Sequence, residues 1–446
     1  MDTPIRDFAQ RYADRRTLRL HMPGHKGQPV LGPEPLDITE IDGADVLYHA
    51  RGIIRQSEAH AAALFGTART LYSTEGSSLS IRAMLYLALL YAKAQGRGAK
   101  ILASRNAHKT FMTAAALLDL EVSWLYPPSG ENLLSCPLRP QELEQCLSSM
   151  EEKPIGVYLT SPDYLGNRLE LRPLAELCRK YGVLLLVDNA HGAYLHFLPE
   201  PCHPMDLGAD LCCDSAHKTL PVLTGGAYLH ISKDAPSFFS EQAESAMAMF
   251  ASTSPSYLIL QSLDLANAYL ASDYSRRLSD FADRVQALKE RLRRRGFPLV
   301  GREPLKLTVA PKAYGYTGTE LAQRLEGSDM ICEFSDPDHT VLMLTPEQGE
   351  EGLEILEQAL LSVEKRSPIL TQAPPVFPSE KKCSLRQALF SPSCELPLGQ
   401  CEGKILANAS ITCPPAVPIV LCGEEITDQA IRSMEYYGIS TCRVLL

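Results

Sequence analysis

The sequence predicts an α/β protein with a buried, mainly parallel sheet, and two patterns support this prediction. Short apolar runs alternate with helical segments along residues 100–214, as expected of successive βαβ units. The run VLLLVD has no polar residue before its final aspartate, which is typical of a strand covered on both faces. The same alternation returns after residue 300, so we expect a second, smaller α/β domain there.

The expected elements of the larger domain follow one another closely. A short helix is predicted over 56–65, and an apolar helix over 79–93 follows the turn TEGSS at Thr74–Ser78. The expected strands are 100–103, 121–125, 155–160, 183–188 and 210–214, and the expected helices between them are 109–118, 141–150 and 173–181.

The remaining segments divide the chain into five parts. A long helical region over 256–295 ends before Gly296, a typical helix stop. Strands are expected over 306–310, 331–335 and 340–344, and helices over 320–325 and 352–364. The predicted division is an extended arm rich in Pro, Gly and charge (1–45), a large domain (46–255), the long helix with the small α/β domain (256–365), a proline-rich linker (366–382) and a small C-terminal domain (383–446).

Composition excludes several classes of protein. The net charge of −10 argues against a nucleic-acid-binding surface. No apolar run approaches the roughly 20 residues that a membrane span requires, and the polar start is not a secretory signal, so we expect a cytoplasmic protein. The thirteen cysteines contain no C-x-x-C pair, and Pro23 and Gly24 prevent His21 and His25 from sharing a helix face, so no metal site is predicted.

Two strand ends carry the most informative side chains. Asp188 ends the run VLLLVD, and Lys218 follows the next expected strand, over 210–214. Ligands of open parallel sheets bind beyond the carboxyl ends of the strands. A lysine that forms a Schiff base and an aspartate that protonates a pyridine nitrogen would suit pyridoxal phosphate there. Taken singly, Asp188 is also compatible with a helix cap, and Lys218 with a surface charge.

A phosphate cradle is expected beside this pair. Gly76, Ser77 and Ser78 precede the apolar helix, whose free N–H groups and positive end would attract a dianion. Ser215 and His217, directly before Lys218, could add donors. An ordinary helix N-cap would explain the same Gly-Ser-Ser run.

Two histidines lie near the predicted strand ends. His108 follows the strand over 100–103, and His191 comes three residues after Asp188. An imidazole at such a place can stack on a pyridine ring or transfer protons. A packed or exposed histidine without a catalytic role remains the alternative for each.

With these motifs in place, the sequence resembles the Orn/Lys/Arg decarboxylase family in its short form, like bacterial biosynthetic arginine and lysine decarboxylases. The resemblance covers nearly the whole chain. Its blocks are HMPGHKG (21–27), DITEIDGADVLYHARGII (37–54), YSTEGSS (72–78), SRNAHKT (104–110), TSPDYLGN (160–167), VDNAHGAY (187–194), DSAHKTL (214–220), TSPSYLILQSLD (253–264) and CPPAVPIVLCGEEI (413–426).

The resemblance implies a fold-type-I, pyridoxal-phosphate-dependent enzyme with a large domain built on a mainly parallel seven-stranded sheet and a small C-terminal α+β domain. By position, Lys218 resembles the Schiff-base lysine, Asp188 the partner of the pyridinium nitrogen, and His108 the residue stacked on the ring. The implied phosphate-binding positions are Ser77, Ser78, Ser215, His217 and, from a neighbouring subunit, Ser252; His191 is a further candidate at the cofactor.

The implied activity is decarboxylation of a basic amino acid, arginine, lysine or ornithine, by a homodimer or larger homo-oligomer with shared active sites. Polyamine-pathway amines would be the products. Another fold-type-I reaction, such as transamination or elimination, and a non-catalytic homologue that binds the cofactor are the alternatives, because Lys218 and Asp188 would serve all of them.

Three positions depart from the usual family pattern and leave the substrate open. They are Glu75 beside the phosphate cradle, Asp163 in the S-P-x-Y loop, and Ala416 in the C-terminal proline block. Acidic side chains that could read the distal, cationic end of a substrate are Glu395, Glu402, Glu424 and Glu425.

Overall fold

The computed structural model describes residues 1–127, 134–375, 378–409 and 417–446, in two compact units. The first unit comprises Met1–Gly98 and Leu171–Arg277, and the second comprises Ala99–Glu170 and Leu278–Leu446. The predicted seven-stranded, mainly parallel α/β sheet is confirmed, with four strands in the first unit and three in the second. The five-part domain division stays a prediction.

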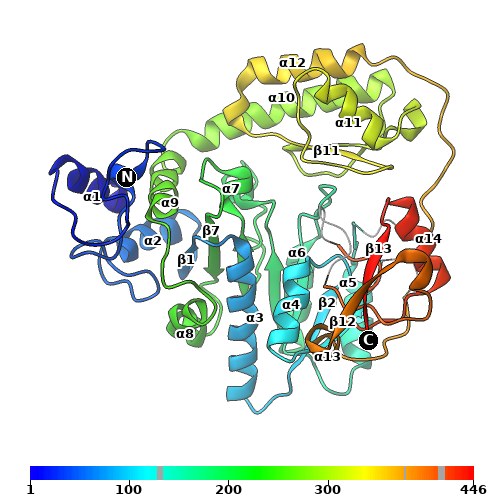
Figure 1. The fold of residues 1–446 in the computed structure, drawn as a ribbon, viewed down its shortest axis with the longest axis horizontal. Helices are drawn as coiled ribbons and strands as arrows, with labels where there is room; N and C mark the ends of the chain where they lie inside the picture. Colours follow the sequence, from blue (N-terminus) through cyan, green and yellow to red (C-terminus); the bar gives the residue numbers. More distant parts are fainter. Residues whose placement is uncertain (128–133, 376–377, 410–416) are drawn as a thin grey trace. The chain divides into compact units, whose positions relative to one another are not determined.

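The first unit holds strands in the order β1-β7-β6-β5 (Figure 1). β5 and β6 are parallel, whereas β7 is antiparallel to both β6 and β1. Every residue of β5, β6 and β7 is buried, as the continuous apolar runs require. The strand bounds are β1 Arg69–Ser73, β5 Leu184–Asp188, β6 Leu211–Asp214 and β7 Ala227–Ile231.

Helices surround these strands, and α3 packs against β7 and α8. The helix bounds in this unit are α1 Pro4–Asp14, η1 Glu34–Leu36, α2 Ile53–Leu64, α3 Ser77–Ala94, α6 Leu171–Lys180, η2 Ala193–Phe197, α7 Ala216–Thr219, α8 Ser237–Ala248 and α9 Tyr257–Leu270, while α10 Tyr274–Arg295 starts here and continues into the second unit.

Three features of the first unit differ from the sequence-based expectation. The arm over 1–45, expected to be extended, begins with helix α1, whose Ile5 is fully buried. The backbone N–H groups of Ile5 and Arg6 donate to the carboxylate of Asp264 at 2.9 and 3.0 Å, which satisfies donors that every helix start leaves open. Strands β1 and β7 and helix α8 were not predicted; β1 and β7 are short and lack the apolar–polar alternation of a half-buried strand.

The region over 256–295, expected as one long helix, is two helices, α9 and α10. The chain turns at Ala271–Asp273, and the Asp273 carboxylate accepts hydrogen bonds from the side chains of Arg276 and Arg277. No Gly or Pro marks this break, so the usual stop signals did not reveal it.

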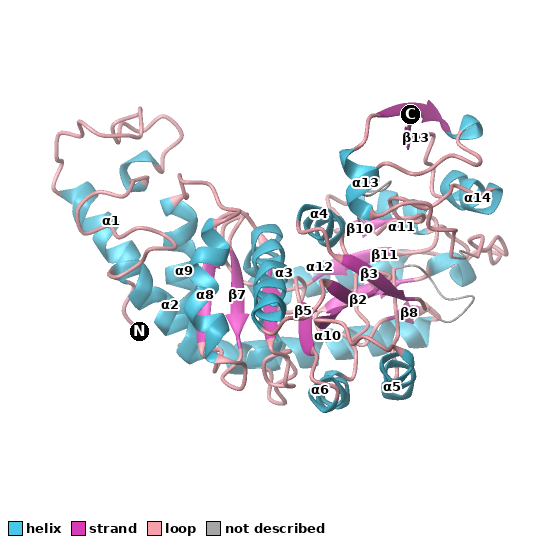
Figure 2. Cartoon of the chain, turned by 90° about the horizontal axis from the view of Figure 1, so that it is seen from below, coloured by secondary structure: helices cyan, strands magenta, loops and turns pink. Residues whose placement is uncertain are grey.

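The second unit contains three groups of strands. β4, β2 and β3 are parallel neighbours in that order. The small antiparallel sheet has the order β10-β11-β9-β8, and Figure 2 labels its strands β10, β11 and β8. Near the C-terminus β12 pairs with β13 (Figure 1). The strand bounds are β2 Lys100–Ser104, β3 Glu121–Leu125, β4 Gly156–Thr160, β8 Leu299–Val300, β9 Lys306–Val309, β10 Phe334–Ser335, β11 Thr340–Met343, β12 Ser393–Pro397 and β13 Thr441–Leu445.

The helices expected over 109–118, 141–150, 320–325 and 352–364 agree closely with the structure, whereas the helices over 385–390 and 428–436 were not predicted. Among the strands, β10 is shorter than expected, because only two of the five residues predicted over 331–335 pair with β11. The helix bounds are α4 Lys109–Leu117, α5 Pro140–Ser149, η3 Pro311–Tyr314, α11 Gly318–Glu326, η4 Pro346–Gln348, α12 Gly349–Ser362, α13 Leu385–Phe390, η5 Leu398–Gln400 and α14 Asp428–Tyr436.

The described ranges were also considered for membrane-spanning helices and disulfide bonds. None of the helices there has both the length and the apolar composition needed to cross a membrane. No disulfide joins the cysteines within the same ranges.

The buried carboxyl group of Glu58 on α2 predicts a pH-dependent stability. Its Oε1 accepts from the Tyr72 N–H at 3.0 Å, but burial outweighs this bond and raises the pKa of Glu58 from 4.5 to about 7. Unfolded Glu58 therefore loses its proton at lower pH than folded Glu58. Between about pH 4.5 and 7, its contribution to the free energy of unfolding should fall by at most about 1.4 kcal/mol per pH unit, and stay constant above.

Urea unfolding of the wild type and of Glu58→Gln at pH 5, 6, 7 and 8 measures this contribution. The variant cannot ionise, so the wild type should lose stability relative to it between pH 5 and 7. Parallel pH dependences of the two proteins would contradict the assignment.

Candidate functional site

Asp188 lies at the carboxyl end of β5, as the sequence predicts. Its side chain is almost completely buried, and Oδ1 accepts hydrogen bonds from the Ala190 N–H at 3.2 Å and from the Cys213 thiol at 3.6 Å. Cys213 pairs with Asp188 in the neighbouring parallel strand β6. The carboxylate is therefore fixed at the sheet edge where ligands of parallel sheets bind.

Lys218 lies in the short helix α7, which directly follows β6. Its Nζ is 3.1 Å from Nε2 of His191, which is buried three residues beyond Asp188. An ammonium group would donate to the neutral imidazole, and a neutral amine could accept from it. The structure thus brings Lys218 together with the loop after Asp188 and identifies His191 as a direct partner of the lysine.

Three loops of the first unit meet at the N-terminus of α3. The hydroxyl of Ser215 donates to that of Ser77 at 2.8 Å, and the Gly76 N–H donates to the Gly225 carbonyl at 2.7 Å. Gly225 has a φ of +101°, and a Cβ there would lie 2.8 Å from the Thr74 oxygen. Only glycine allows this close approach.

This arrangement suits a phosphate group. The hydroxyl groups of Ser77 and Ser78 lie in the first turn of an 18-residue helix, where N–H groups and the helix dipole favour an anion. Hydroxyl donors, a half-buried amine and a buried carboxylate on adjoining loops are the donor set that pyridoxal phosphate requires. The described residues of the first unit therefore fit that cofactor.

His217 contributes to the cradle through one nitrogen. Its Nδ1 is 2.9 Å from the Gly226 carbonyl oxygen, so Nδ1 carries a proton and donates it to that oxygen. Nε2 can then donate to an anion only when the imidazole is protonated.

Ser252 lies beside Glu75 of the same chain. Its backbone N–H donates to the Glu75 carboxylate at 2.8 Å, and both residues are exposed. Glu75, which departs from the family pattern, therefore holds the loop of Ser252 at the rim of the cradle. The predicted contact of Ser252 with the phosphate of a neighbouring subunit stays a prediction.

His108 is the N-cap of α4 in the second unit. Its Nδ1 accepts from the Thr110 N–H at 3.2 Å and lies 3.0 Å from the Thr110 hydroxyl. Both contacts involve Nδ1 and fix the orientation of the imidazole ring at the start of α4. His108 belongs to a different unit from Lys218 and Asp188, so its stacking on the cofactor stays a prediction.

The structure explains the departure at Asp163. Its carboxylate is buried and accepts from the backbone N–H of Asn167 at 2.8 Å and from the Asn167 side-chain amide at 2.9 Å. Burial raises the pKa of Asp163, although these bonds and Lys306 oppose the change. Asp163 therefore closes the SPDYLGN loop. The departure at Ala416 lies outside the described residues.

The four acidic candidates for the distal end of a substrate have different surroundings. Glu424 is buried, accepts from the Tyr126 hydroxyl and the Leu421 N–H at 3.3 and 2.8 Å, and is attracted by the buried Arg105. Because these groups already compensate its charge, Glu424 is poorly suited to bind a cationic substrate. Glu425 pairs with Lys382 and Glu395 bonds Thr441, whereas Glu402 is exposed.

The sequence analysis did not single out a buried polar group in the strands behind the site. It consists of Asn189, His203, Asp214 and His230, each of which is 0 % exposed. A histidine inside the otherwise apolar strand AYLHI was the one available signal, because a buried imidazole needs a polar partner. Its partners come from other segments and were not visible in the local pattern.

Comparisons with known proteins show which family the chain belongs to. Residues 3–352 match the family described as Orn/Lys/Arg decarboxylase, major domain. The chain is 30% identical to the uncharacterized protein YaaO of Bacillus subtilis, over 97% of this chain and 94% of that one. It is 28% identical to an arginine decarboxylase of the same organism, over 96% and 92%.

A solved structure of similar fold is the constitutive lysine decarboxylase of Escherichia coli, with a TM-score of 0.78 and 18% identity, over 100% of this chain and 82% of that one. Its low identity supports the fold alone. The family match, which extends over most of the chain, supports the cofactor and the reaction class. The chain therefore belongs to the Orn/Lys/Arg decarboxylase family and is a pyridoxal-phosphate-dependent amino-acid decarboxylase.

Proposed function

We propose that this enzyme removes the α-carboxylate of a basic amino acid, with arginine as the first candidate and lysine or ornithine as alternatives. The observation that carries the proposal is the contact of Lys218 with the loop that follows Asp188, next to the hydroxyl groups at the start of α3. Arginine is favoured because relatives over nearly the full length are named arginine decarboxylases. The products would be CO₂ and an amine of the polyamine pathway, formed in the cytoplasm.

Each predicted site residue has a defined task in this proposal. Bound pyridoxal phosphate supplies an electron-accepting ring that stabilises the electron pair left behind by CO₂. Lys218 holds the cofactor through its Nζ, and Asp188 keeps a proton on the ring nitrogen. His108 covers one face of the ring. The phosphate is bound by Ser77, Ser78, Ser215 and His217, and by Ser252 of a neighbouring subunit.

Proton transfer can then be assigned to particular atoms. Lys218 Nζ or His108 returns a proton to the substrate Cα. His191 Nε2, at 3.1 Å from Lys218 Nζ, can hold a proton in exchange with the amine whenever Lys218 is not bound to the cofactor. His191 therefore acts on the lysine directly, as a candidate at the cofactor.

A homodimer or larger homo-oligomer is part of the proposal. The arm residues Leu18, Leu20, Val30 and Leu31 are each 80–88 % exposed, and such a group of apolar side chains on one segment is typical of an interface. A second copy of the chain is the proposed occupant, since the family resemblance implies shared active sites.

The substrate and the roles of Lys218 and Asp188 are tested together by product analysis. The cofactor-loaded enzyme should convert arginine to agmatine, detected by mass spectrometry, with lysine and ornithine as parallel substrates. Lys218→Ala should abolish turnover, and Asp188→Asn should slow it by about a hundredfold or more, because the ring nitrogen loses its charged partner.

Matched controls come from the exposed pair Lys233 and Asp234. Lys233→Ala and Asp234→Asn remove the same groups at the surface and should keep wild-type activity. Keto-acid products, or no product from any of the three amino acids despite bound cofactor, would reject the proposed reaction.

The proposed interface predicts a change of oligomeric state. Leu20→Asp with Leu31→Asp places two charges on the arm and should shift the protein toward monomers in analytical ultracentrifugation, since burying unpaired carboxylates is costly. Leu370→Asp is the control, because Leu370 is equally exposed, at 86 %, but lies outside the arm. A monomeric wild type, or an unchanged assembly in the double variant, would disprove this role of the arm.

A further inference from the structure

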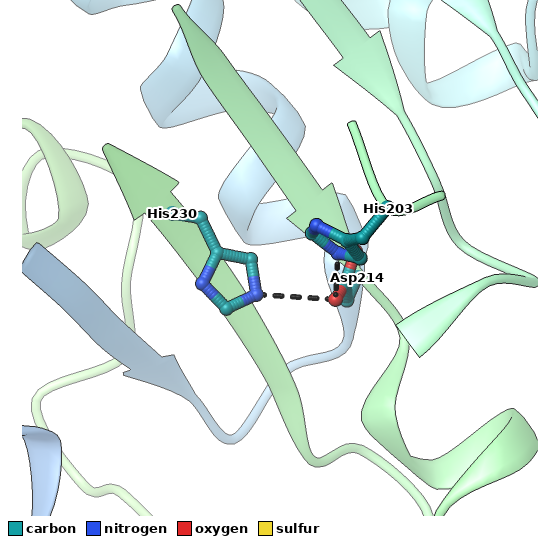
Figure 3. Close-up of side chains that lie close together, drawn as sticks. All are labelled: His203, Asp214 and His230. Carbon is teal, nitrogen blue, oxygen red and sulfur yellow. Dashed lines mark hydrogen bonds and ion pairs between the residues drawn. The ribbon is translucent and has the colours of Figure 1, made fainter. Parts of the chain in front are cut away.

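A fully buried cluster of His203, Asp214 and His230 lies within the first unit (Figure 3). Nε2 of His203 is 2.9 Å, and Nε2 of His230 3.1 Å, from the same carboxylate oxygen, Oδ2 of Asp214. The side chains of all three residues are 0 % exposed. The two imidazoles approach from different segments, His203 from the loop after η2 and His230 from β7.

The second carboxylate oxygen connects the cluster to the strand end of Asp188. Asn189 donates through Nδ2 to Oδ1 of Asp214 at 2.7 Å, and its backbone N–H donates to the Cys213 carbonyl at 2.9 Å. A Cβ on Gly192 would lie 2.1 Å from the Asn189 amide oxygen, so glycine is required for Asn189 to take this position. We call these four residues, Asn189, His203, Asp214 and His230, the Asp214 network.

The hydrogen bonds of His203 favour a role other than metal binding for this cluster. The Met205 N–H donates to Nδ1 of His203 at 3.2 Å, so His203 carries its proton on Nε2 and donates it to Asp214. A metal ion would need the Nε2 lone pair instead. Both Nε2 atoms are also at hydrogen-bond distance from one oxygen, Oδ2 of Asp214, so a cation could bind there only if these hydrogen bonds were broken.

The electrostatics are those of a compensated anion. Burial alone would raise the pKa of Asp214, but the imidazoles of His203 and His230, which donate hydrogen bonds to the carboxylate, outweigh burial and lower it. The ionised carboxylate accepts from two ring N–H groups and one amide N–H. A buried carboxylate with this many donors resists displacement, because each bond lost would leave a buried polar group unsatisfied.

The position of the network in the chain links it to the proposed active site. Asn189 directly follows Asp188, and Asp214 directly precedes Ser215, three residues before Lys218. We propose that the Asp214 network is a positioning device that holds the ends of β5 and β6 in fixed relation, so that Asp188 and Lys218 meet the same cofactor. This inference rests on the proposed function of these two residues, and none of the network residues is assigned a contact with substrate.

The decisive experiment compares Asp214→Asn with wild type as cofactor-loaded, full-length proteins. Asparagine keeps the shape, but its amide nitrogen cannot accept the hydrogen bonds that one of the two carboxylate oxygens accepts. We expect kcat to fall about tenfold or more with little change in KM. The pH at which the visible absorbance of the bound cofactor changes should move by about half a pH unit or more, because the charged neighbours of the cofactor shift.

His230 provides the rescue test. His230→Gln retains an N–H donor for Asp214 and should remain close to wild type in the absorbance titration, whereas His230→Leu should behave like Asp214→Asn. Asn189→Ala removes a single hydrogen bond to Asp214 and serves as the second variant if Asp214→Asn does not fold. It should shift the titration in the same direction by a smaller amount.

Asp336→Asn is the matched control, since Asp336 and His339 form a buried pair in the second unit. It should lower the melting temperature without moving the cofactor titration. An Asp214→Asn variant that likewise loses only stability would overturn the positioning role. So would one equivalent of metal per chain, removable by a chelator, in the purified wild type.

The absorbance titration separates this inference from the proposed function. It is measured without any amino acid, so its result stands whether or not the wild type forms an amine. Failure of the proposed function would show instead as a wild-type absorbance band in Lys218→Ala or as missing amine product.

Discussion

The parallel pairing of β5 with β6 is the constraint on which the site depends. Asp188 lies opposite Cys213 in this pairing, so both strands end at the same edge, and the chain can deliver a carboxylate from one and an amine from the other. Asp188 lies in a completely buried strand, whereas Lys218 is half-buried and contacts His191. In the proposed reaction the buried carboxylate of Asp188 keeps its place, while the less buried amine of Lys218 gives up its bond to the cofactor to the substrate amine and takes it back.

Much of this arrangement was predictable from the sequence, because the relevant signals are local. The run VLLLVD and the Gly-Ser-Ser turn each correspond to one element boundary, β5 and the start of α3. Strands β1 and β7 were missed because their alternation is weak, and their identity as strands comes from antiparallel pairing across residues 69–73 and 227–231. The break between α9 and α10 was missed because no helix stop residue lies at Ala271–Asp273.

The site itself was predictable to a lesser degree, because its residues acquire their roles from partners distant in sequence. His191 was ambiguous until its Nε2 proved to lie at the Lys218 amine, and Glu424 lost its candidacy as a substrate ligand through its buried neighbours. Departures from the family pattern also become intelligible. Asp163 closes its own loop through Asn167. Glu75 holds the backbone of Ser252 and so affects the rim of the proposed phosphate cradle.

Glu75 and Asp214 illustrate two different ways of placing an anion near the proposed site of a cofactor that carries a phosphate group. Glu75 is exposed, so water and counterions screen its repulsion of a phosphate dianion. Asp214 lies in the interior, where screening is weak, and its charge is tolerable only because two imidazoles and an amide surround it. The same compensation makes Asp214 a stronger structural anchor than a neutral residue would be, since any displacement breaks several charge-assisted bonds at once. Burying an anion in this position costs desolvation free energy, but the hydrogen bonds that compensate its charge fix the ends of the two strands. The proposed reaction depends on one carboxylate and one amine at those ends and therefore requires them to be fixed.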